Sequence, residues 1–139
     1  MKMLSARNQL PGIIKSISRG AVNAEVIIVT PTGVEISSII TLGSCVRMNL
    51  EPGDNVVAVV KASDVMVAAG NDFAISCRNN IPGFIKKINI GTVNNEIIID
   101  ANGTELVSII TQSSTKRLDL KETMIVSALI KASNIIIMK

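Results

Sequence analysis

The chain has 139 residues, of which 47% are hydrophobic, 18% charged and 1% aromatic, with a net charge of +3 and no histidine. The lack of histidine excludes mechanisms that use imidazole as base, proton carrier or metal ligand, and two phenylalanines are too few for a surface that stacks nucleic-acid bases. The apolar runs are far shorter than the roughly 20 residues of a membrane-spanning helix. Residues 1–14 carry polar side chains where a secretory signal is apolar, so we expect a cytoplasmic protein.

The first half of the chain predicts five short β-strands and one short helix. The strands cover residues 10–18, 21–29, 34–41, 55–61 and 65–68. They are rich in Val and Ile and are separated by Gly, Pro and Asp turns. Residues 43–50 show no strand alternation and begin near Ser44, a good helix cap, and Ser113 or Ser114 would cap the counterpart in the second half.

The second half repeats the first at a spacing of about 71 residues. The string SARNQLPG at 5–12 returns as SCRNNIPG at 76–83, and KAS at 61–63 returns at 131–133. We therefore expect an all-β chain of two tandem five-stranded OB-like barrels, each with one short helix. The two domains would cover residues 1–69 and 73–139, with a small, polar linker between them.

Some of the predicted strands are apolar on both faces, notably residues 26–29 and 97–99. A barrel of this size buries one face of each strand, so the other face needs a neighbouring domain or subunit. The sequence therefore predicts a homo-oligomer.

Three polar segments occur in both copies, at residues 5–8, 21–23 and 61–63 of the first. They offer hydroxyl, amide, guanidinium, ammonium and loop N–H groups, which are nearly all donors. Such a set suits a deprotonated tetrahedral dianion, whereas hydrogen phosphate also needs an acceptor. Taken singly, each segment also fits a structural role as a surface cation, a turn or a cap.

The remaining reactive and charged residues favour structural roles. Cys45 and Cys77 are far apart and form no CxxC pair, so we expect buried or half-buried thiols and no metal site. The basic residues around 116–121 are diluted by Asp119 and Glu122, which indicates a solvated surface. No nucleophile is paired with a base, so we expect no catalytic residues.

The runs SARNQLPGIIKSISRGAVNAEV, VEISSIIT and VVAVVKASDVMVA resemble a Mop domain, the molybdate-binding module of molbindins, which is related to TOBE domains. The similarity spans both copies, so the chain resembles a di-Mop molbindin. The resemblance implies a cytoplasmic protein that stores molybdate or tungstate as bound ligand, with no organic cofactor and no catalysis. It also implies a trimer that binds oxyanions at domain and subunit interfaces, without nucleic-acid or membrane partners.

The resemblance also implies which residues bind the oxyanion. In the first copy they are Ser5, Arg7, Asn8, Val22, Asn23, Lys61, Ala62 and Ser63. In the second copy they are Ser76, Arg78, Asn79, Val93, Asn94, Lys131, Ala132 and Ser133. The Val-Asn pairs would line sites at contacts between subunits.

The second copy departs from this pattern, so its sites are expected to differ in affinity or to be partly lost. The replacements are Cys77 for Ala6, Asn80 for Gln9, Val107 for Ser37 and Asn134 for Asp64. Thr123-Met124 also replaces Gly53-Asp54, which predicts a differently built turn before the fourth strand.

Two other functions stay open. An OB-like barrel can bind nucleic acid, although the sequence lacks the aromatic residues and the basic stripe of that class. An anion-sensing regulatory module would have to act in trans, because the sequence contains no P-loop and no helix-turn-helix pattern.

Overall fold

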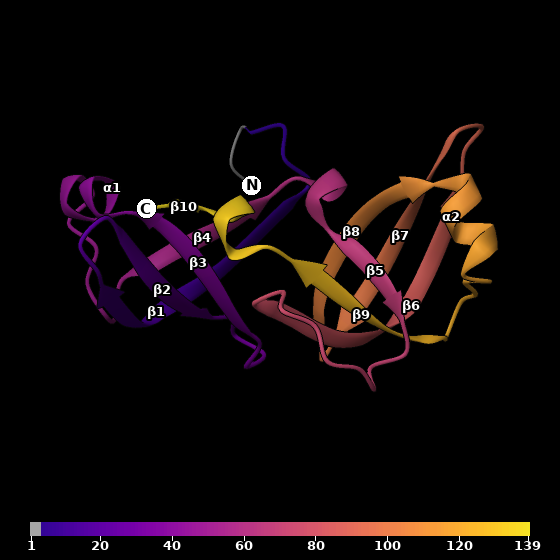
Figure 1. Cartoon of the computed structure of the whole chain (residues 1–139), viewed down its shortest axis with the longest axis horizontal. Coiled ribbons are helices and arrows are strands. Elements are labelled where there is room, and N and C mark those ends of the chain that lie inside the picture. The colour runs from indigo at the N-terminus through magenta and orange to yellow at the C-terminus, as the bar shows by residue number, and fades with distance from the viewer. Residues whose placement is uncertain (1–3) are drawn as a thin grey trace.

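The computed structural model describes residues 4–139 and consists mainly of β-strands (Figure 1). The elements of the first half are β1 (Asn8–Arg19), β2 (Asn23–Val29), β3 (Glu35–Thr41), α1 (Leu42–Arg47), β4 (Asn55–Val60), the 3-10 turn η1 (Ala62–Asp64) and β5 (Met66–Ala69). Those of the second half are β6 (Asn79–Ile90), β7 (Asn94–Ala101), β8 (Thr104–Thr111), α2 (Gln112–Arg117), β9 (Ile125–Ile130), η2 (Ala132–Asn134) and β10 (Ile136–Met138). The prediction of an all-β chain with two five-stranded units is confirmed.

The two sheets exchange their fifth strands. The strand orders are β10-β4-β1-β2-β3 and β5-β9-β6-β7-β8, and all pairs are antiparallel. Five strands per copy favour a barrel built from one copy alone, but β5 pairs with β9 of the second copy and β10 pairs with β4 of the first. Each sheet therefore takes four strands from one copy and one from the other.

The 3-10 turns η1 and η2 carry the chain from one sheet to the other. Each turn begins at the alanine of the repeated Lys-Ala-Ser sequence, directly after its lysine, and the next residue after each turn is buried. The buried Ser38 hydroxyl donates to the Ile135 carbonyl at 2.7 Å, and the Ser108 hydroxyl donates to the Val65 carbonyl. These bonds satisfy carbonyls that would otherwise be buried without a partner at the crossovers.

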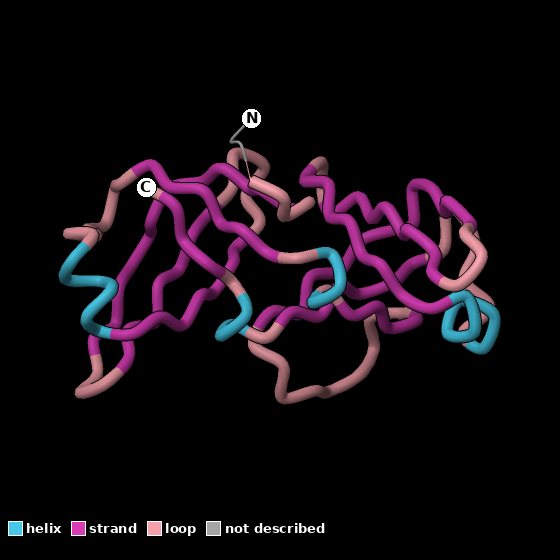
Figure 2. Tube along the Cα trace, turned by 90° about the horizontal axis from the view of Figure 1, so that it is seen from above, coloured by secondary structure: helices cyan, strands magenta, loops and turns pink. Residues whose placement is uncertain are grey.

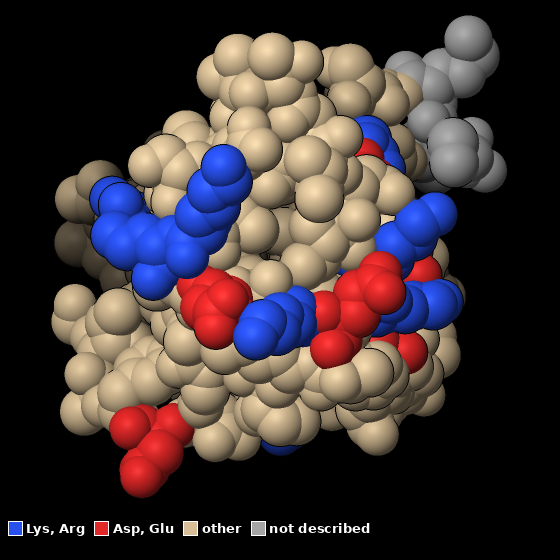
Figure 3. All heavy atoms as spheres, turned by 90° about the vertical axis from the view of Figure 1, so that its right-hand side faces the viewer, with Lys and Arg blue, Asp and Glu red and all other residues tan. Residues whose placement is uncertain are grey.

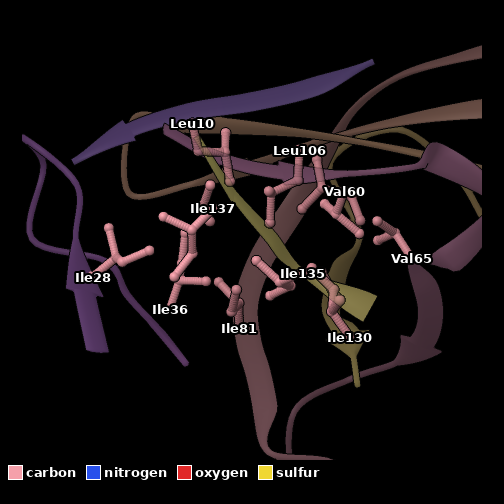
Figure 4. Close-up of a cluster of buried hydrophobic side chains, with 14 of the residues drawn as sticks. Leu10, Ile28, Ile36, Val60, Val65, Ile81, Leu106, Ile130, Ile135 and Ile137 are labelled. Atoms are coloured by element: carbon pink, nitrogen blue, oxygen red, sulfur yellow. The ribbon is translucent and has the colours of Figure 1, made fainter. Parts of the chain in front are cut away.

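The hydrophobic core is continuous through both sheets (Figure 4). Ile28 and Ile36 of the first sheet lie near Ile137, which arrives with the exchanged β10. Ile81 and Ile130 belong to the second sheet and are members of the same cluster. Since the buried side chains form one cluster, neither half has a separate core.

Two local expectations from the sequence are wrong. The residues that cap α1 and α2 are Thr41 and Thr111, whose hydroxyls accept the N–H of Ser44 and Ser114 at 3.1 Å. The helices begin earlier than predicted because threonine at the strand end serves as a cap.

The turn before the fourth strand is also built alike in both copies. Gly53 has a φ of 94° and Thr123 has a φ of 73°. Their N–H groups donate to the equivalent carbonyls of Ile14 and Ile85 at 2.8 and 2.7 Å. Backbone hydrogen bonds thus preserve the turn although Thr123 lacks the conformational freedom of glycine.

The molecule is elongated, with α1 and α2 at opposite ends and the 3-10 turns near its middle (Figure 2). Along β2 and β7, fully buried residues alternate with half-buried ones such as Ile27 and Ile98. Apolar side chains are also exposed in pairs, since Phe84 of β6 lies opposite Ile125 of β9 and both are more than a third exposed.

Candidate functional site

Two grooves lie where the crossovers meet the segments that precede β1 and β6. The first groove has a volume of about 660 Å³ and the second about 420 Å³. The first groove is lined by residues 4–7, 59–64, 109, 133, 134, 136 and 138. The second groove is lined by residues 39, 66, 75–78 and 131–133. The pseudo-symmetry of the two copies thus produces two similar sites in one chain.

The fold brings together segments that are more than 50 residues apart in sequence. Ser5 and Arg7 face Lys61, Ala62 and Ser63 across the first groove. The two segments belong to different parts of the fold, since residues 5–7 precede β1 whereas Lys61 precedes η1 and residues 62 and 63 begin it.

The second groove repeats this arrangement. Ser76 and Arg78 line it together with Lys131, Ala132 and Ser133. Ser133 lines the first groove as well, so the two grooves meet at η2.

The predicted Val-Asn pairs lie elsewhere. Asn23 pairs with Thr41 and Asn94 with Thr111, which places both hairpins beside the helices at the two ends of the molecule. Val22 and Val93 are 72% and 68% exposed. Within one chain these residues do not reach either groove.

Asn8 and Asn79 are buried and join the two sheets. The Asn8 amide donates to the Val107 carbonyl at 2.8 Å and accepts the Val107 N–H at 2.7 Å. Asn79 makes the same pair of bonds to Ser37 and also donates to the Ile130 carbonyl at 3.1 Å. Both amide groups are therefore occupied by backbone groups, of which those of Val107 and Ser37 belong to the opposite sheet.

Each groove arginine forms an ion pair with a glutamate of the other copy. Arg78 donates to Glu25 through Nε at 2.7 Å and Nη2 at 3.0 Å, and Arg7 donates to Glu96 through Nη1 at 2.5 Å. Neither glutamate is among the predicted site residues, although the repeat of V-N-x-E at 22–25 and 93–96 is a signal for them.

The ion pairs shift the acidity of these groups. The hydrogen bond from Arg78 is the main cause that lowers the pKa of Glu25, and the hydrogen bond from Arg7 is the main cause that lowers the pKa of Glu96. In turn, the hydrogen bond to Glu25 raises the pKa of Arg78. A guanidinium has five N–H groups, so Arg78 retains three donors beyond those that bind Glu25.

Lys61 and Lys131 differ from the arginines because neither forms a salt bridge within residues 4–139. Both are exposed and immediately precede a 3-10 turn, whose first N–H groups have no acceptor within the turn. An unpaired ammonium beside serine hydroxyls and free N–H groups is a donor set for a small anion.

The grooves differ in several of the side chains that line them. Cys77, half-buried, lines the second groove where Ala6 lines the first. Asp64 and Asn134 both line the first groove. The first groove therefore contains a carboxylate acceptor that the second groove lacks.

Metal ligands do not gather at this site: in the described part of the chain, no three His, Cys, Asp or Glu side chains lie close enough to hold an ion. None of the helices found between residues 4 and 139 is long and apolar enough to cross a membrane. At the end of the molecule that carries α2, positive and negative side chains alternate (Figure 3), and Lys121 pairs with Asp119 at 3.4 Å.

Similarity to known proteins covers nearly the whole chain. The TOBE domain model matches residues 4–67 and 75–137. The chain is 39% identical over 135 residues to the molybdenum-pterin-binding protein MopA of Rhodobacter capsulatus and 34% identical over 134 residues to the molybdenum transport protein ModE of Azotobacter vinelandii. It spans about half the length of these two relatives, at 51% and 50%.

A shorter relative and a solved structure match over their full lengths. Molybdenum-pterin-binding protein 2 of Clostridium pasteurianum is 42% identical over 66 residues, which are 48% of this chain and 97% of that protein. A crystal structure of the cytoplasmic molybdate-binding protein ModG with molybdate bound superposes with a TM-score of 0.93, at 38% identity and 99% coverage of both chains.

Proposed function

Because the chain belongs to the TOBE domain family and carries two such domains in tandem, we propose that it binds molybdate, or the similar tungstate, for storage in the cytoplasm. The names of the relatives MopA and ModE and the molybdate held by ModG support this choice of ligand. The anion would be bound and released unchanged, so the chain would act as a binding protein and not as an enzyme.

The observation that carries the proposal is the pair of unpaired lysines, Lys61 and Lys131, at equivalent positions of two similar grooves. An exposed ammonium without a carboxylate partner leaves positive charge available for a dianion. Each charge-assisted hydrogen bond to that dianion contributes about 1.5–3 kcal/mol net. The serine hydroxyls and the remaining arginine N–H groups add hydrogen-bond donors, which suit a ligand that carries no proton.

We assign the two grooves as binding sites. In the first, the anion contacts Ser5, Arg7, Lys61, Ala62 and Ser63. In the second, it contacts Ser76, Arg78, Lys131, Ala132 and Ser133. Asn8 and Asn79 support these sites from beneath, because their hydrogen bonds hold the start of β1 and β6 against the opposite sheet.

The sequence units 1–69 and 73–139, which exchange their fifth strands, form the two halves of each subunit in a trimeric assembly. The exposed apolar side chains and the half-buried second faces of β2 and β7 support association, since burial of such surface stabilises oligomers. In that assembly, Val22, Asn23, Val93 and Asn94 would line further sites at contacts between subunits.

Isothermal titration calorimetry with molybdate tests the assignment of the grooves. Lys61→Ala and Lys131→Ala should each weaken binding to one class of site, by roughly 10- to 100-fold for the loss of a charged hydrogen bond. Lys116→Ala is the matched control, because it removes the same charge from α2. Equal affinities in all four proteins would contradict the assignment.

A competition experiment tests the choice of ligand. Sulfate is also a deprotonated dianion and should compete with molybdate, whereas hydrogen phosphate brings a proton that a donor-only site cannot accept. Phosphate should therefore compete poorly at the second groove, which lacks Asp64. Stronger competition by phosphate than by sulfate at that groove, measured in a Lys61→Ala protein, would contradict a donor-only second groove.

A further inference from the structure

The segment of residues 4–7 lies between two hollows. One side faces the first groove, and the other faces a second hollow of about 620 Å³ that is also lined by Gln9, Pro11 and Val57. The segment precedes β1 and takes part in no strand. Because a hollow lies on each side of the segment, its position depends strongly on the polar contacts that it makes.

Gln9 supplies two of these contacts. Its amide nitrogen donates to the Leu4 carbonyl at 3.2 Å and to the Ala6 carbonyl at 3.1 Å, so both of its N–H groups are used. The Arg7 ion pair with Glu96 adds a third contact at the end of the segment. Gln9 itself is fixed in β1, where it lies opposite Val59 of β4.

The orientation of the Gln9 side chain has a cost in stability, because its amide oxygen is left without a hydrogen bond. It is the buried side-chain oxygen or nitrogen that lacks a hydrogen-bond partner within residues 4–139. A buried acceptor without a donor destabilises the folded chain. If Gln9 served stability alone, a side chain without an unpaired buried oxygen would be better. The amide is explained if its nitrogen is needed to hold residues 4–7.

The second copy has no such contact. Its equivalent of Gln9 is Asn80, which is one methylene shorter, exposed and opposite Leu129 of β9. No side-chain hydrogen bond from Asn80 reaches residues 75–77; there, the Cys77 thiol donates to the Asn79 carbonyl at 3.6 Å. The two copies therefore hold their groove-lining segments by different means.

We propose that Gln9 is a positioning residue of the first groove, which holds the backbone of Ser5 and Ala6 in place for the bound oxyanion. This inference rests on the proposed function of the groove. A preorganised segment loses less conformational entropy when the anion binds, so the Gln9 contacts raise the affinity of the first groove for molybdate. Asn80 is the reason why the second groove lacks this advantage.

Two substitutions test the proposal. Gln9→Met keeps the length of the side chain but removes both donors and the unpaired oxygen. Lys131→Ala weakens the second groove, so binding measured in this background is mainly that of the first groove. There, Gln9→Met should weaken molybdate binding by roughly 3- to 10-fold, the effect of about one hydrogen bond. Asn80→Gln in a Lys61→Ala background is the matched gain-of-contact variant and should strengthen binding at the second groove.

Two further measurements separate positioning from a general structural role. The urea midpoint of Gln9→Met should equal or exceed that of the parent, because the substitution removes a buried unpaired oxygen. Hydrogen exchange of residues 4–7 should become faster. A lower midpoint together with weaker binding would assign Gln9 a structural role and overturn the proposal.

The outcomes also distinguish this inference from the proposed function. If the Lys131→Ala protein binds molybdate and Gln9→Met does not change the affinity, the role of Gln9 is overturned while the function stands. If the parent protein binds no molybdate, the proposed function fails and the role of Gln9 in binding fails with it.

Discussion

At the scale of single residues, charge pairing separates the cations of the two grooves. Arg7 and Arg78 are held by Glu96 and Glu25, whereas Lys61 and Lys131 have no carboxylate partner among the described residues. The arginines therefore join the two copies and present their remaining N–H groups in a fixed direction. The lysines contribute the net positive charge that attracts an anion.

Because of these ion pairs, the free energy of unfolding should fall at acidic pH. The pKa of Glu25 and of Glu96 lies below the ordinary 4.5 in the folded chain, chiefly through hydrogen bonds from Arg78 and Arg7. The unfolded chain then takes up protons first, so the contribution of the pairs is complete above pH 4.5 and is lost as the pH falls through the lowered values.

Urea denaturation at a series of pH values checks this dependence. The double variant Glu25→Gln/Glu96→Gln should lose stability less steeply with acid than the wild type. Glu35→Gln is the control, because its pair with Lys15 is exposed. Identical slopes in the double variant and the wild type would contradict a stabilising role of the pairs.

Thr123 offers a second prediction at this scale. A β-branched residue at a φ of 73° is strained, and the equivalent position of the first copy is Gly53. Thr123→Gly should raise the free energy of unfolding by about 0.5–1 kcal/mol, since the relief of strain exceeds the entropic cost of glycine. Gly53→Thr should lower it. Denaturant titration of both variants is the measurement, and a loss of stability in Thr123→Gly would be the contrary result.

At the scale of elements, the crossovers explain why the Lys-Ala-Ser segment is repeated. In each copy its lysine precedes, and its alanine and serine begin, the 3-10 turn that leads the fifth strand into the opposite sheet, and the segment also lines a groove. The fold and the binding site thus depend on the same three residues. The N–H groups at the start of the turn are available to a ligand because the chain changes direction there.

The hydroxyls of Ser38 and Ser108 should stabilise the exchange of the fifth strands, because they donate to backbone carbonyls at the two crossovers. Ser38→Ala would leave the buried Ile135 carbonyl without a donor and should lower the free energy of unfolding by about 1–3 kcal/mol. Ser16→Ala, an exposed position in β1, is the control and should have little effect. Equal stabilities of the two variants would show that the crossover does not need this hydrogen bond.

The sequence predicted the elements well but not their exchange. The Val- and Ile-rich segments predicted strands close to those observed, and the similarity to Mop domains is confirmed by the TOBE domain match. The alternation of residues 65–68 is the same whichever sheet they join, so the pattern could not place β5. Asn8 and Asn79 were grouped with the anion ligands because their motif repeats, and only the fold shows that their amides are used between the sheets.

At the scale of the whole molecule, the exchanged strands and the continuous core make the two halves one folding unit. Neither sheet is complete without a strand from the other copy. We therefore expect a single thermal transition, with calorimetric and van't Hoff enthalpies that agree. Two separate transitions in differential scanning calorimetry would show that the halves fold independently.

The central claim is that the grooves at the crossovers bind molybdate. Diffraction from crystals grown with molybdate, recorded near the molybdenum absorption edge, locates the metal directly. We expect anomalous peaks beside both Lys61 and Lys131. An absence of peaks from both grooves would contradict the claim.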